Sequence, residues 1–484
     1  MKVVIIGGGE VGFHVAKALS EEDYDITVVD IDPVKCRRAS ENLDVIVVEG
    51  NGASPNTLNE ARVGDADYVL CLTRVDEVNL IASQQAHKLG ANRIIARLRN
   101  QQYTTQDSII RPEKFGVDIV IHPEKAACEE ITRLVKHPYA VQVMDFESGR
   151  LTMLGLKIDS GCENIYGAPL GKIIKKYNHF RFGVIAILRG QETIIPAAEF
   201  IFQKGDTAYF IVKTKDIPNL MDLLSKELTE THRVMILGGG KIGRTLAKDL
   251  PSDTINTRLV DYNRLKAGQI SHNIDESMII YGDGTDIEFL KSENIQDIDS
   301  FICVTENEKT NLIAGLLAKH LGAKQSIIHV STTEYIPTIQ EIGAGAVISK
   351  NLSTVNAILR ELHTDLTEIP VMTFDEIDVD VIEFQPEIGS PVTQRPIREL
   401  NFPQDAIIGM INLPIVKFSV DWWTTLHQGS SVFKVSGPSM TTDYLITLMV
   451  SFFAILLLSL YWFTNIFYII TENRRIERAK LLND

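Results

Sequence analysis

The chain contains 484 residues and carries a formal net charge of −15 at pH 7. Its length suffices for three or four domains, and its negative charge argues against nucleic-acid binding, because a phosphate backbone requires a basic surface. The five cysteines show no C-x-x-C or metal-ligand spacing, so we expect a reducing compartment without disulfides or a metal site.

The first predicted element is an apolar strand that begins directly after Met1, which leaves no room for a signal peptide. The strand leads into a turn with G-x-G-x-x-G spacing, formed by Gly7, Gly8, Gly9, Glu10, Val11 and Gly12. The three glycines of such a turn allow a tight bend, close backbone approach to a pyrophosphate, and close packing of helix on strand. The pattern therefore predicts a dinucleotide site at a helix N-terminus.

An acidic residue accompanies this turn at the expected distance. Asp30 lies 18 residues past Gly12, at the end of a second apolar run. In that place a carboxylate accepts hydrogen bonds from the ribose hydroxyls and repels a 2′-phosphate. The sequence therefore favours NAD over NADP.

Two polar residues follow a buried strand predicted at 68–72. Thr73 either caps the next helix or lies beside the crevice at the carboxyl end of the strand. Asn79, further along that helix, is either a helix-surface amide or part of the site. Both alternatives stay open for each residue.

The region after the first unit has a different pattern. A helix is predicted at 126–136, and alternating stretches after the His137-Pro138 break predict strands at 141–146, 151–158, 182–188 and 208–212. Arg189-Gly190-Gln191-Glu192 is interpreted as a solvated hairpin turn, with a ligand contact as the alternative. The region is typical of a small α/β domain.

A second glycine-rich turn begins 231 residues after the first. It is formed by Gly238, Gly239, Gly240, Lys241, Ile242 and Gly243, and Asp261 again lies 18 residues past the last glycine. Thr305 and Asn311 repeat Thr73 and Asn79. One such motif is a weak signal, but two at matched spacing indicate a duplicated dinucleotide-binding unit.

The second copy of the small domain is shorter than the first. A strand at 379–384, a proline-containing helix start at 390–400 and a strand at 406–411 repeat the earlier pattern, and no sequence counterpart of the remaining strands follows. A truncated domain of this kind is expected to leave unpaired strand edges.

The end of the chain has membrane character. The segment 445–470 contains 26 residues without a charge, whereas a bilayer core requires a helix of about 20 residues. We therefore predict a transmembrane helix there. Arg474, Arg475 and Arg478 follow it, which favours a cytoplasmic C-terminus and conflicts with cytoplasmic nucleotide units. The joint before the tail is either an accidental junction or the link to a membrane tether.

The duplicated pattern resembles a known domain family. The paired glycine turns, the Gly-[Asn/Asp]-Gly step at 50–52 and 282–284, and the Thr-x-x-[Asp/Glu]-x-x-Asn-Leu-Ile-Ala helix resemble the regulator-of-potassium-conductance (RCK, or KTN) domain. Two such units, each followed by a small domain, resemble the TrkA family of nucleotide-binding subunits of bacterial potassium-uptake systems over residues 1 to about 411. The resemblance implies a regulator without enzymatic activity that binds NAD or NADH, with ATP and ADP as further candidate ligands.

The resemblance also implies the site residues. In the first unit these are the six turn residues with Asp30, Thr73, Arg74 and Arg97, and in the second the six turn residues with Asp261, Thr305 and Glu306. Arg97 corresponds to His329, and a largely neutral imidazole cannot hold a pyrophosphate bidentately as a guanidinium does. The second unit is therefore the weaker candidate site.

The resemblance also implies the binding partners, and the tail has a resemblance of its own. The family implies a ring of four chains on the cytoplasmic face of the inner membrane, which gates a TrkH-type potassium-translocating membrane subunit. Residues 412–484 instead resemble the end of the haem-handling CcmC family, in which His427 would be a haem ligand. Two alternatives remain: an NAD-dependent oxidoreductase, supported by the glycine pattern alone, and a membrane haem-handling protein, supported by the tail alone.

The predicted fold class is α/β. Two Rossmann-like domains with doubly wound parallel sheets are expected, each followed by a small RCK C-terminal-type α/β domain, the second of which is truncated. The predicted boundaries are 1–125 and 137–225 for the first pair, 232–355 and 368–411 for the second, and 412–484 for the tail with its transmembrane helix.

Overall fold

The computed structural model describes residues 1–20, 24–105, 108–146, 149–190, 192–367, 371–374, 379–382, 406–408 and 415–417. The chain divides into two compact units, Met1–Ser419 and Val420–Asp484. The predicted transmembrane segment 445–470, the helix start at 390–400 and His427 lie outside the described residues. Among the residues that are described, no helix is both long and apolar enough to cross a membrane.

The first sheet is parallel and has the strand order β3-β2-β1-β4-β5-β6. Its strands are β1 (Lys2–Ile6), β2 (Asp25–Asp30), β3 (Ile46–Glu49), β4 (Tyr68–Cys71), β5 (Arg93–Arg97) and β6 (Ile119–Ile121). The connecting helices are α1 (Glu10–Ser20), α2 (Pro33–Asn42), α3 (Pro55–Glu60) and α4 (Asp76–Leu89). The chain order reverses between β1 and β4, which places a ligand crevice at their carboxyl ends.

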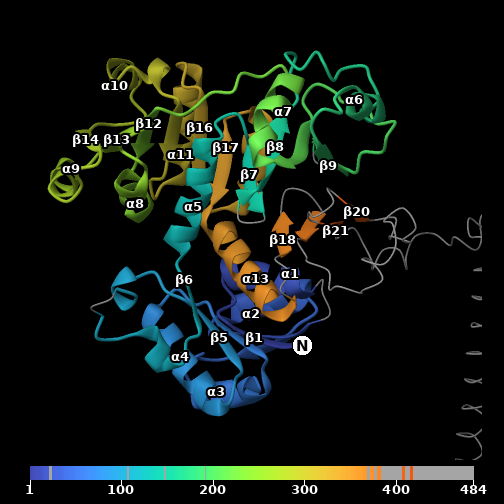
Figure 1. The fold of residues 1–484 in the computed structure, drawn as a ribbon. Helices are drawn as coiled ribbons and strands as arrows, with labels where there is room; N and C mark the ends of the chain where they lie inside the picture. Colours follow the sequence, from blue (N-terminus) through green and yellow to red (C-terminus); the bar gives the residue numbers. More distant parts are fainter. Residues whose placement is uncertain are drawn as a thin grey trace, which may run out of the picture. The chain divides into compact units, whose positions relative to one another are not determined.

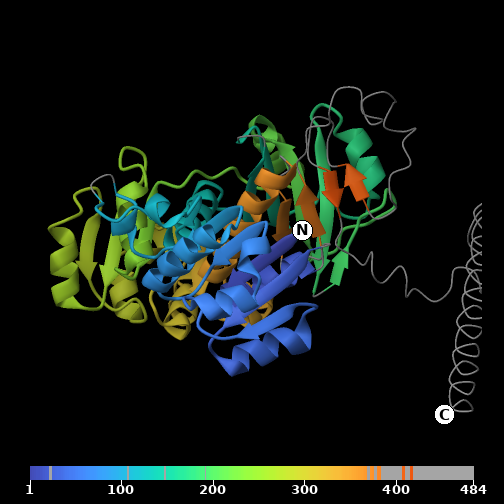
Figure 2. The same ribbon diagram turned by 90° about the horizontal axis from the view of Figure 1, so that it is seen from below.

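The second sheet repeats this order as β14-β13-β12-β15-β16-β17. Its strands are β12 (Arg233–Leu237), β13 (Asn256–Asp261), β14 (Met278–Tyr281), β15 (Ser300–Cys303), β16 (Gln325–Val330) and β17 (Ala346–Ser349). The helices are α8 (Lys241–Asp249), α9 (Arg264–Ser271), α10 (Ile287–Ser292), α11 (Glu308–His320) and α12 (Ile336–Ile342). The two sheets can be followed in blue and in yellow-green to orange in Figures 1 and 2. The predicted pair of Rossmann-like parallel sheets is confirmed.

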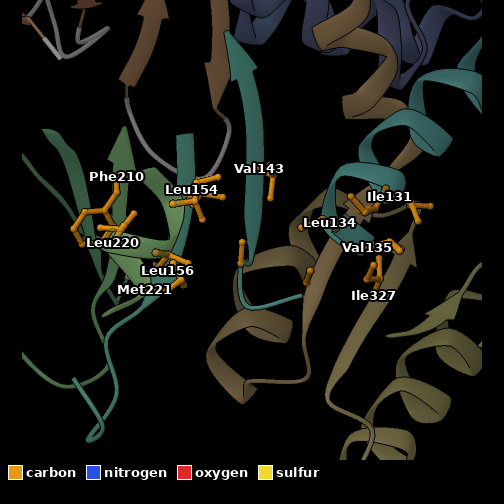
Figure 3. Packing of buried hydrophobic residues seen from close by; sticks show 14 of the residues in the cluster. Ile131, Leu134, Val135, Val143, Leu154, Leu156, Phe210, Leu220, Met221 and Ile327 are labelled. Atoms are coloured by element: carbon orange, nitrogen blue, oxygen red, sulfur yellow. The ribbon is translucent and has the colours of Figure 1, made fainter. Parts of the chain in front are cut away.

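A five-stranded antiparallel sheet lies between them in sequence. Its order is β10-β9-β11-β8-β7. The strands are β7 (Gln142–Phe146), β8 (Leu151–Lys157), β9 (Phe182–Arg189), β10 (Glu192–Ile194) and β11 (Thr207–Lys213), with helices α6 (Leu170–Lys176) and α7 (Ile217–Leu223). Leu154, Leu156 and Phe210 of the sheet pack with Leu220 and Met221 of α7 in one buried cluster (Figure 3).

Arg189 forms part of the hairpin between β9 and β10, as predicted, and Gly190 has a positive φ of 64° there. The guanidinium of Arg189 is held by the buried carboxylate of Asp206, with Nε and Oδ1 2.8 Å apart. The ligand-contact alternative for this turn therefore gains no support, because the side chain already has a strong partner.

Two helices cross between the nucleotide units. Helix α5 (Pro123–Lys136) follows β6 of the first sheet and packs against α8 of the second. Helix α13 (Lys350–Thr367) follows β17 of the second sheet and packs against α1 of the first (Figure 1). Ile358 and Leu362 of α13 belong to the same buried cluster as Val11 and Val15 of α1. Each unit thus completes its core with a helix that starts from the other.

A four-stranded sheet follows α13 and differs from the expected truncated domain. Its order is β18-β19-β21-β20, with strands β18 (Val371–Phe374), β19 (Val379–Ile382), β20 (Ala406–Ile408) and β21 (Ile415–Lys417). The last strand lies beyond residue 411, where the sequence predicted the pattern to end. The sequence did not predict β21, because a strand of three residues is too short to show an alternating pattern.

Candidate functional site

The first glycine turn has the geometry that its spacing requires. Gly7 has a φ of +113°, which side chains rarely tolerate, and a Cβ there would lie 2.9 Å from the Thr73 backbone nitrogen. A Cβ on Gly12 would lie 1.8 Å from the Gly7 carbonyl oxygen, so helix α1 can approach β1 only without one. At Gly9 a Cβ would meet no atom within 4 Å. The turn therefore leaves open space at the position where a pyrophosphate would approach.

Asp30 ends β2 beside this turn. Its carboxylate accepts hydrogen bonds from the Gly8 N–H at 2.7 Å and from the Asp32 N–H at 2.9 Å. Lys35 Nζ lies 3.5 Å from Asp30 Oδ1. Since a carboxylate has about four acceptor sites, capacity remains for ribose hydroxyls.

The turn and Asp30 border a cavity of about 330 Å³, which lies in the range of small-molecule sites. The predicted residues that line it are Gly7, Gly9, Glu10, Val11, Asp30, Thr73, Arg74 and Arg97. Gly8 and Gly12 are absent from the lining; Gly8 donates to Asp30, and Gly12 packs against Gly7. Lys35, Asn51, Val78 and Asn351 also line the cavity and were not among the predicted site residues.

Arg97, the last residue of β5, is a buried cation in the lining of this cavity. Its side chain is only 7% exposed, and its Nε has no hydrogen-bond partner among the described residues. Burial and repulsion from Arg99 lower the pKa of Arg97, although Glu124 opposes the shift. A buried N–H donor without an acceptor is costly, and an anion in the cavity would supply the acceptor that Nε lacks.

Glu10 is the acidic residue closest to the start of α1. Arg38 Nη1 donates to Glu10 Oε1 at 2.6 Å. Partial burial opposes ionisation, but the hydrogen bond and the charge of Arg38 hold the pKa of Glu10 below its usual value. Arg38 therefore neutralises a carboxylate that would otherwise repel phosphates.

Thr73 and Asn79 are hydrogen-bonded to each other. Thr73 is not the helix cap and Asn79 is not a helix-surface amide, so these two alternatives are wrong. The N-cap of α4 is Val75 rather than Thr73. Asn79 is fully buried; its Oδ1 accepts from Thr73 N–H and Oγ1 at 2.9 and 2.6 Å, and its Nδ2 donates to the Arg97 carbonyl at 2.7 Å. The pair ties the ends of β4 and β5 together and so positions the backbone of Arg97.

The second turn repeats the backbone geometry. Gly238 has a φ of +114°, and a Cβ on Gly243 would lie 1.9 Å from the Gly238 carbonyl oxygen. Asn311 makes the same bonds to Thr305 and to the carbonyl of His329 as Asn79 does in the first unit. These contacts preserve the fold of the turn in both copies.

The acid of the second unit is more fully engaged than Asp30. Asp261 Oδ2 accepts from the Gly239 N–H at 2.8 Å and lies 2.9 Å from Lys266 Nζ. Burial opposes ionisation, but the hydrogen bonds from Lys266 and from backbone N–H groups hold the pKa of Asp261 below its usual value. A ribose would have to compete with the lysine for this carboxylate.

The phosphate end of the second unit also differs. Burial and repulsion from Lys350 lower the pKa of His329 to about 4, although Glu308 opposes the shift, so the imidazole is neutral at pH 7. Lys241 Nζ donates to the carbonyl of Arg99 in the first unit at 2.9 Å. Glu306 is exposed. The second unit thus lacks a buried cation equivalent to Arg97.

Two of the four lining residues that were not predicted, Lys35 and Asn351, were missed for different reasons. Lys35 carried a signal, because Lys35 and Lys266 both lie five residues after the acid of their unit. Asn351 carried none, because it belongs to α13 and reaches the first cavity only through the crossing of helices between units.

Comparison with known proteins covers both parts of the chain. The family model of the TrkA-N domain matches residues 3–123 and 234–350, and that of heme exporter protein C matches residues 405–481. The Trk system potassium uptake protein TrkA of Halomonas elongata is 31% identical over 414 residues, which cover 85% of this chain and 90% of that protein. The TrkA homolog of Archaeoglobus fulgidus is 31% identical over 411 residues, 85% and 91% of the two chains.

Solved structures resemble the fold at lower identity. The GsuK channel bound to NAD superposes with a TM-score of 0.52 at 18% identity and covers 77% of this chain and 66% of that chain. The GsuK RCK domain gives a TM-score of 0.51 at 16% identity, with coverage of 88% and 94%. At these identities the likeness concerns the fold.

Proposed function

Because the chain belongs to the TrkA family of Trk-system potassium uptake proteins, we propose that it is a nucleotide-sensing regulatory subunit of such a system. The ligand would be NAD or NADH, bound at the first glycine turn. The observation that carries this proposal is the cavity there, in which Arg97 Nε has no partner among the described residues while Asp30 retains acceptor capacity.

The proposed pose follows from the chemistry of the lining. The pyrophosphate would lie over Gly9 at the start of α1, where free N–H groups and the helix dipole favour an anion, with Arg97 as its buried counter-charge. The adenosine ribose would hydrogen-bond to Asp30. ADP and ATP share the adenosine diphosphate half of NAD, so these contacts support them as further ligands, and a GsuK structure has been solved with NAD bound.

Asn351 suggests how binding would be transmitted. It lines the first cavity but belongs to α13, which continues from the second sheet. A ligand in the first cavity would therefore contact both units and favour one arrangement of them. Such a ligand shifts the equilibrium only by its difference in affinity for the two arrangements. We propose that four chains form a ring and that this shift gates a TrkH-type membrane subunit from the cytoplasmic face of the inner membrane.

The second unit is proposed as the weaker site, since a neutral His329 stands at the position of Arg97 and Lys266 already forms an ion pair with Asp261. We further propose that the chain is not an oxidoreductase. The described lining of the first cavity contains no histidine, cysteine or tyrosine, and its carboxylates already have partners: Glu10 accepts from Arg38, and Asp30 accepts from backbone N–H groups and lies beside Lys35. The haem-handling alternative concerns His427, outside the described residues, and haem absorbance of the purified chain tests it.

The test uses calorimetric titration of the full chain with NAD, NADH, ADP and ATP. The variant is Gly9→Val, because the side chain enters open space in the free protein and so blocks a pyrophosphate without disturbing the fold. The matched control is Gly240→Val, whose nearest atom would be the Val304 carbonyl oxygen at 3.9 Å. We expect NAD binding to disappear in Gly9→Val at unchanged thermal stability and to persist in Gly240→Val. Undiminished binding in Gly9→Val would remove the first turn as the site.

A further inference from the structure

The second small domain contains a strand that comes from the tail. β21 (Ile415–Lys417) lies between β19 and β20 in a four-stranded sheet. Both β21 and its neighbour β20 (Ala406–Ile408) lie in the part of the chain that matches heme exporter protein C, residues 405–481, and β21 also lies beyond residue 411, where the resemblance to the first small domain ends. The labels β18, β20 and β21 mark three of these strands in Figure 1.

The first small domain shows what occupies this place when the domain is complete. There β11 lies between β8 and β9 and pairs antiparallel with both. In the second domain β21 pairs antiparallel with β19 and with β20. The orders β7-β8-β11-β9 and β18-β19-β21-β20 therefore correspond strand for strand, and β21 holds the position of β11.

The first two strands of each small domain correspond in sequence and in register. β7 contains Val143-Met144-Asp145-Phe146 and β18 is Val371-Met372-Thr373-Phe374. Val143 pairs with Leu154, and Val371 pairs with Ile382. The two hairpins therefore share both sequence and register.

This alignment extends across the inserted strand. In the first domain one row of opposed residues consists of Val143, Leu154, Phe210 and Val184, all of them buried. The corresponding row of the second domain consists of Val371, Ile382, Ile415 and Ile408. Residues directly opposite one another share a face of the sheet. The tail thus supplies an apolar residue at the place where the first domain has Phe210.

The register also places Lys417 directly opposite Asp380, where the first domain has Val212 opposite Thr152. Opposite charges in directly opposed positions stabilise a sheet, and like charges destabilise it. A slip by one residue would lose this pair and would also move Ile415 out of the apolar row.

We propose that the second small domain is completed by the tail: Ile415–Lys417 is the donor strand that fills the slot between β19 and β20 in place of the strand equivalent to β11. Without it, both neighbours would expose an unpaired edge, which invites pairing with other chains. Within the described residues β21 has three residues, and β11 has seven. The start of the tail would therefore be a structural part of the second domain.

Hydrogen exchange on the full chain tests this proposal. Val416→Pro removes a ladder donor from the middle of the inserted strand, and Val416→Ile is the matched control. We expect amides of β18, β19 and β20 to exchange roughly tenfold faster in Val416→Pro, the effect of about one lost hydrogen bond, while β7 and β8 are unchanged. Equal exchange in the two variants would overturn the proposal.

A charge exchange tests the register without proline. Lys417→Glu places two carboxylates opposite each other, and we expect β19 amides to exchange roughly two- to fivefold faster. Adding Asp380→Lys should restore the original rates. If the double variant exchanges as fast as Lys417→Glu, then Lys417 is not opposite Asp380 and the assigned strand is wrong.

Discussion

Replacing Arg97 with methionine is expected to weaken NAD binding and to stabilise the free protein. The guanidinium is 7% exposed, and its Nε has no partner in the described part of the chain. Methionine keeps an unbranched, apolar side chain that reaches to about the position of Nε, and it removes the rest of the guanidinium with its charge and its donors. Glu124 would not be orphaned, because Arg99 and Lys350 lie 3.4 and 3.7 Å from its Oε1.

The two expected effects have opposite signs. Hydrogen bonds to charged groups contribute about 1.5–3 kcal/mol, so the affinity for NAD should fall roughly 10- to 150-fold. In the free protein, an unsatisfied buried donor costs about 1–3 kcal/mol, so its removal should raise the free energy of unfolding by about 1 kcal/mol. A residue that merely supports the fold would lower both quantities together.

Calorimetric titration and denaturant unfolding of the free protein measure the two effects. The matched control is His329→Met at the equivalent position of the second unit, which should change NAD affinity less than about twofold. Unchanged affinity in Arg97→Met, or a loss of affinity accompanied by a loss of stability, would refute the assignment of Arg97 as the pyrophosphate ligand.

Three further outcomes are expected. Asp30→Asn should weaken NAD binding by about 1.5–3 kcal/mol in calorimetry. Asp261→Asn should weaken it by less, since Lys266 already lies 2.9 Å from Asp261. Equal losses in the two variants would contradict the asymmetry of the units. The pKa of His329 is lowered to about 4 in the folded protein, so as the pH falls the unfolded state binds a proton at this histidine before the folded state does. The free energy of unfolding should therefore fall by about 2–3 kcal/mol between pH 7 and 4.5. Denaturant curves should show a smaller fall in His329→Gln. Absorbance at the nicotinamide band should reveal no turnover with alcohols, hydroxy acids or aldehydes, and a saturable rate would favour the oxidoreductase alternative.

The sequence predicted those features that depend on local chemistry. The positive φ of Gly7 and the packing of Gly12 follow from spacing alone, because each glycine meets atoms of its own strand–turn–helix unit or of the adjacent strand. The burial of Asn79 could not be decided in the same way. Whether an amide on a helix faces solvent or a neighbouring strand end depends on sheet order, which a single helix does not encode.

Features that depend on contacts between distant parts of the chain were not predicted, for related reasons. Asn351 reaches the first cavity only because α13 crosses between the units, and nothing near residue 351 resembles a nucleotide motif. β21 is three residues long, too short for an alternating pattern to be recognised, and it lies in a segment whose sequence resembles a membrane protein. In both cases the partner lies in a segment that the local pattern does not identify.

The two nucleotide units differ in a way that separates folding from ligand binding. Positions that hold the backbone are the same in both, such as the threonine–asparagine pair that joins neighbouring strand ends. Positions at the phosphate end have changed in charge: Glu10 corresponds to Lys241, and Arg97 to His329. Lys241 now binds a carbonyl of the first unit instead of facing its own site. The second unit therefore keeps the fold of the first, while one of the charges at its glycine turn contacts the neighbouring unit instead.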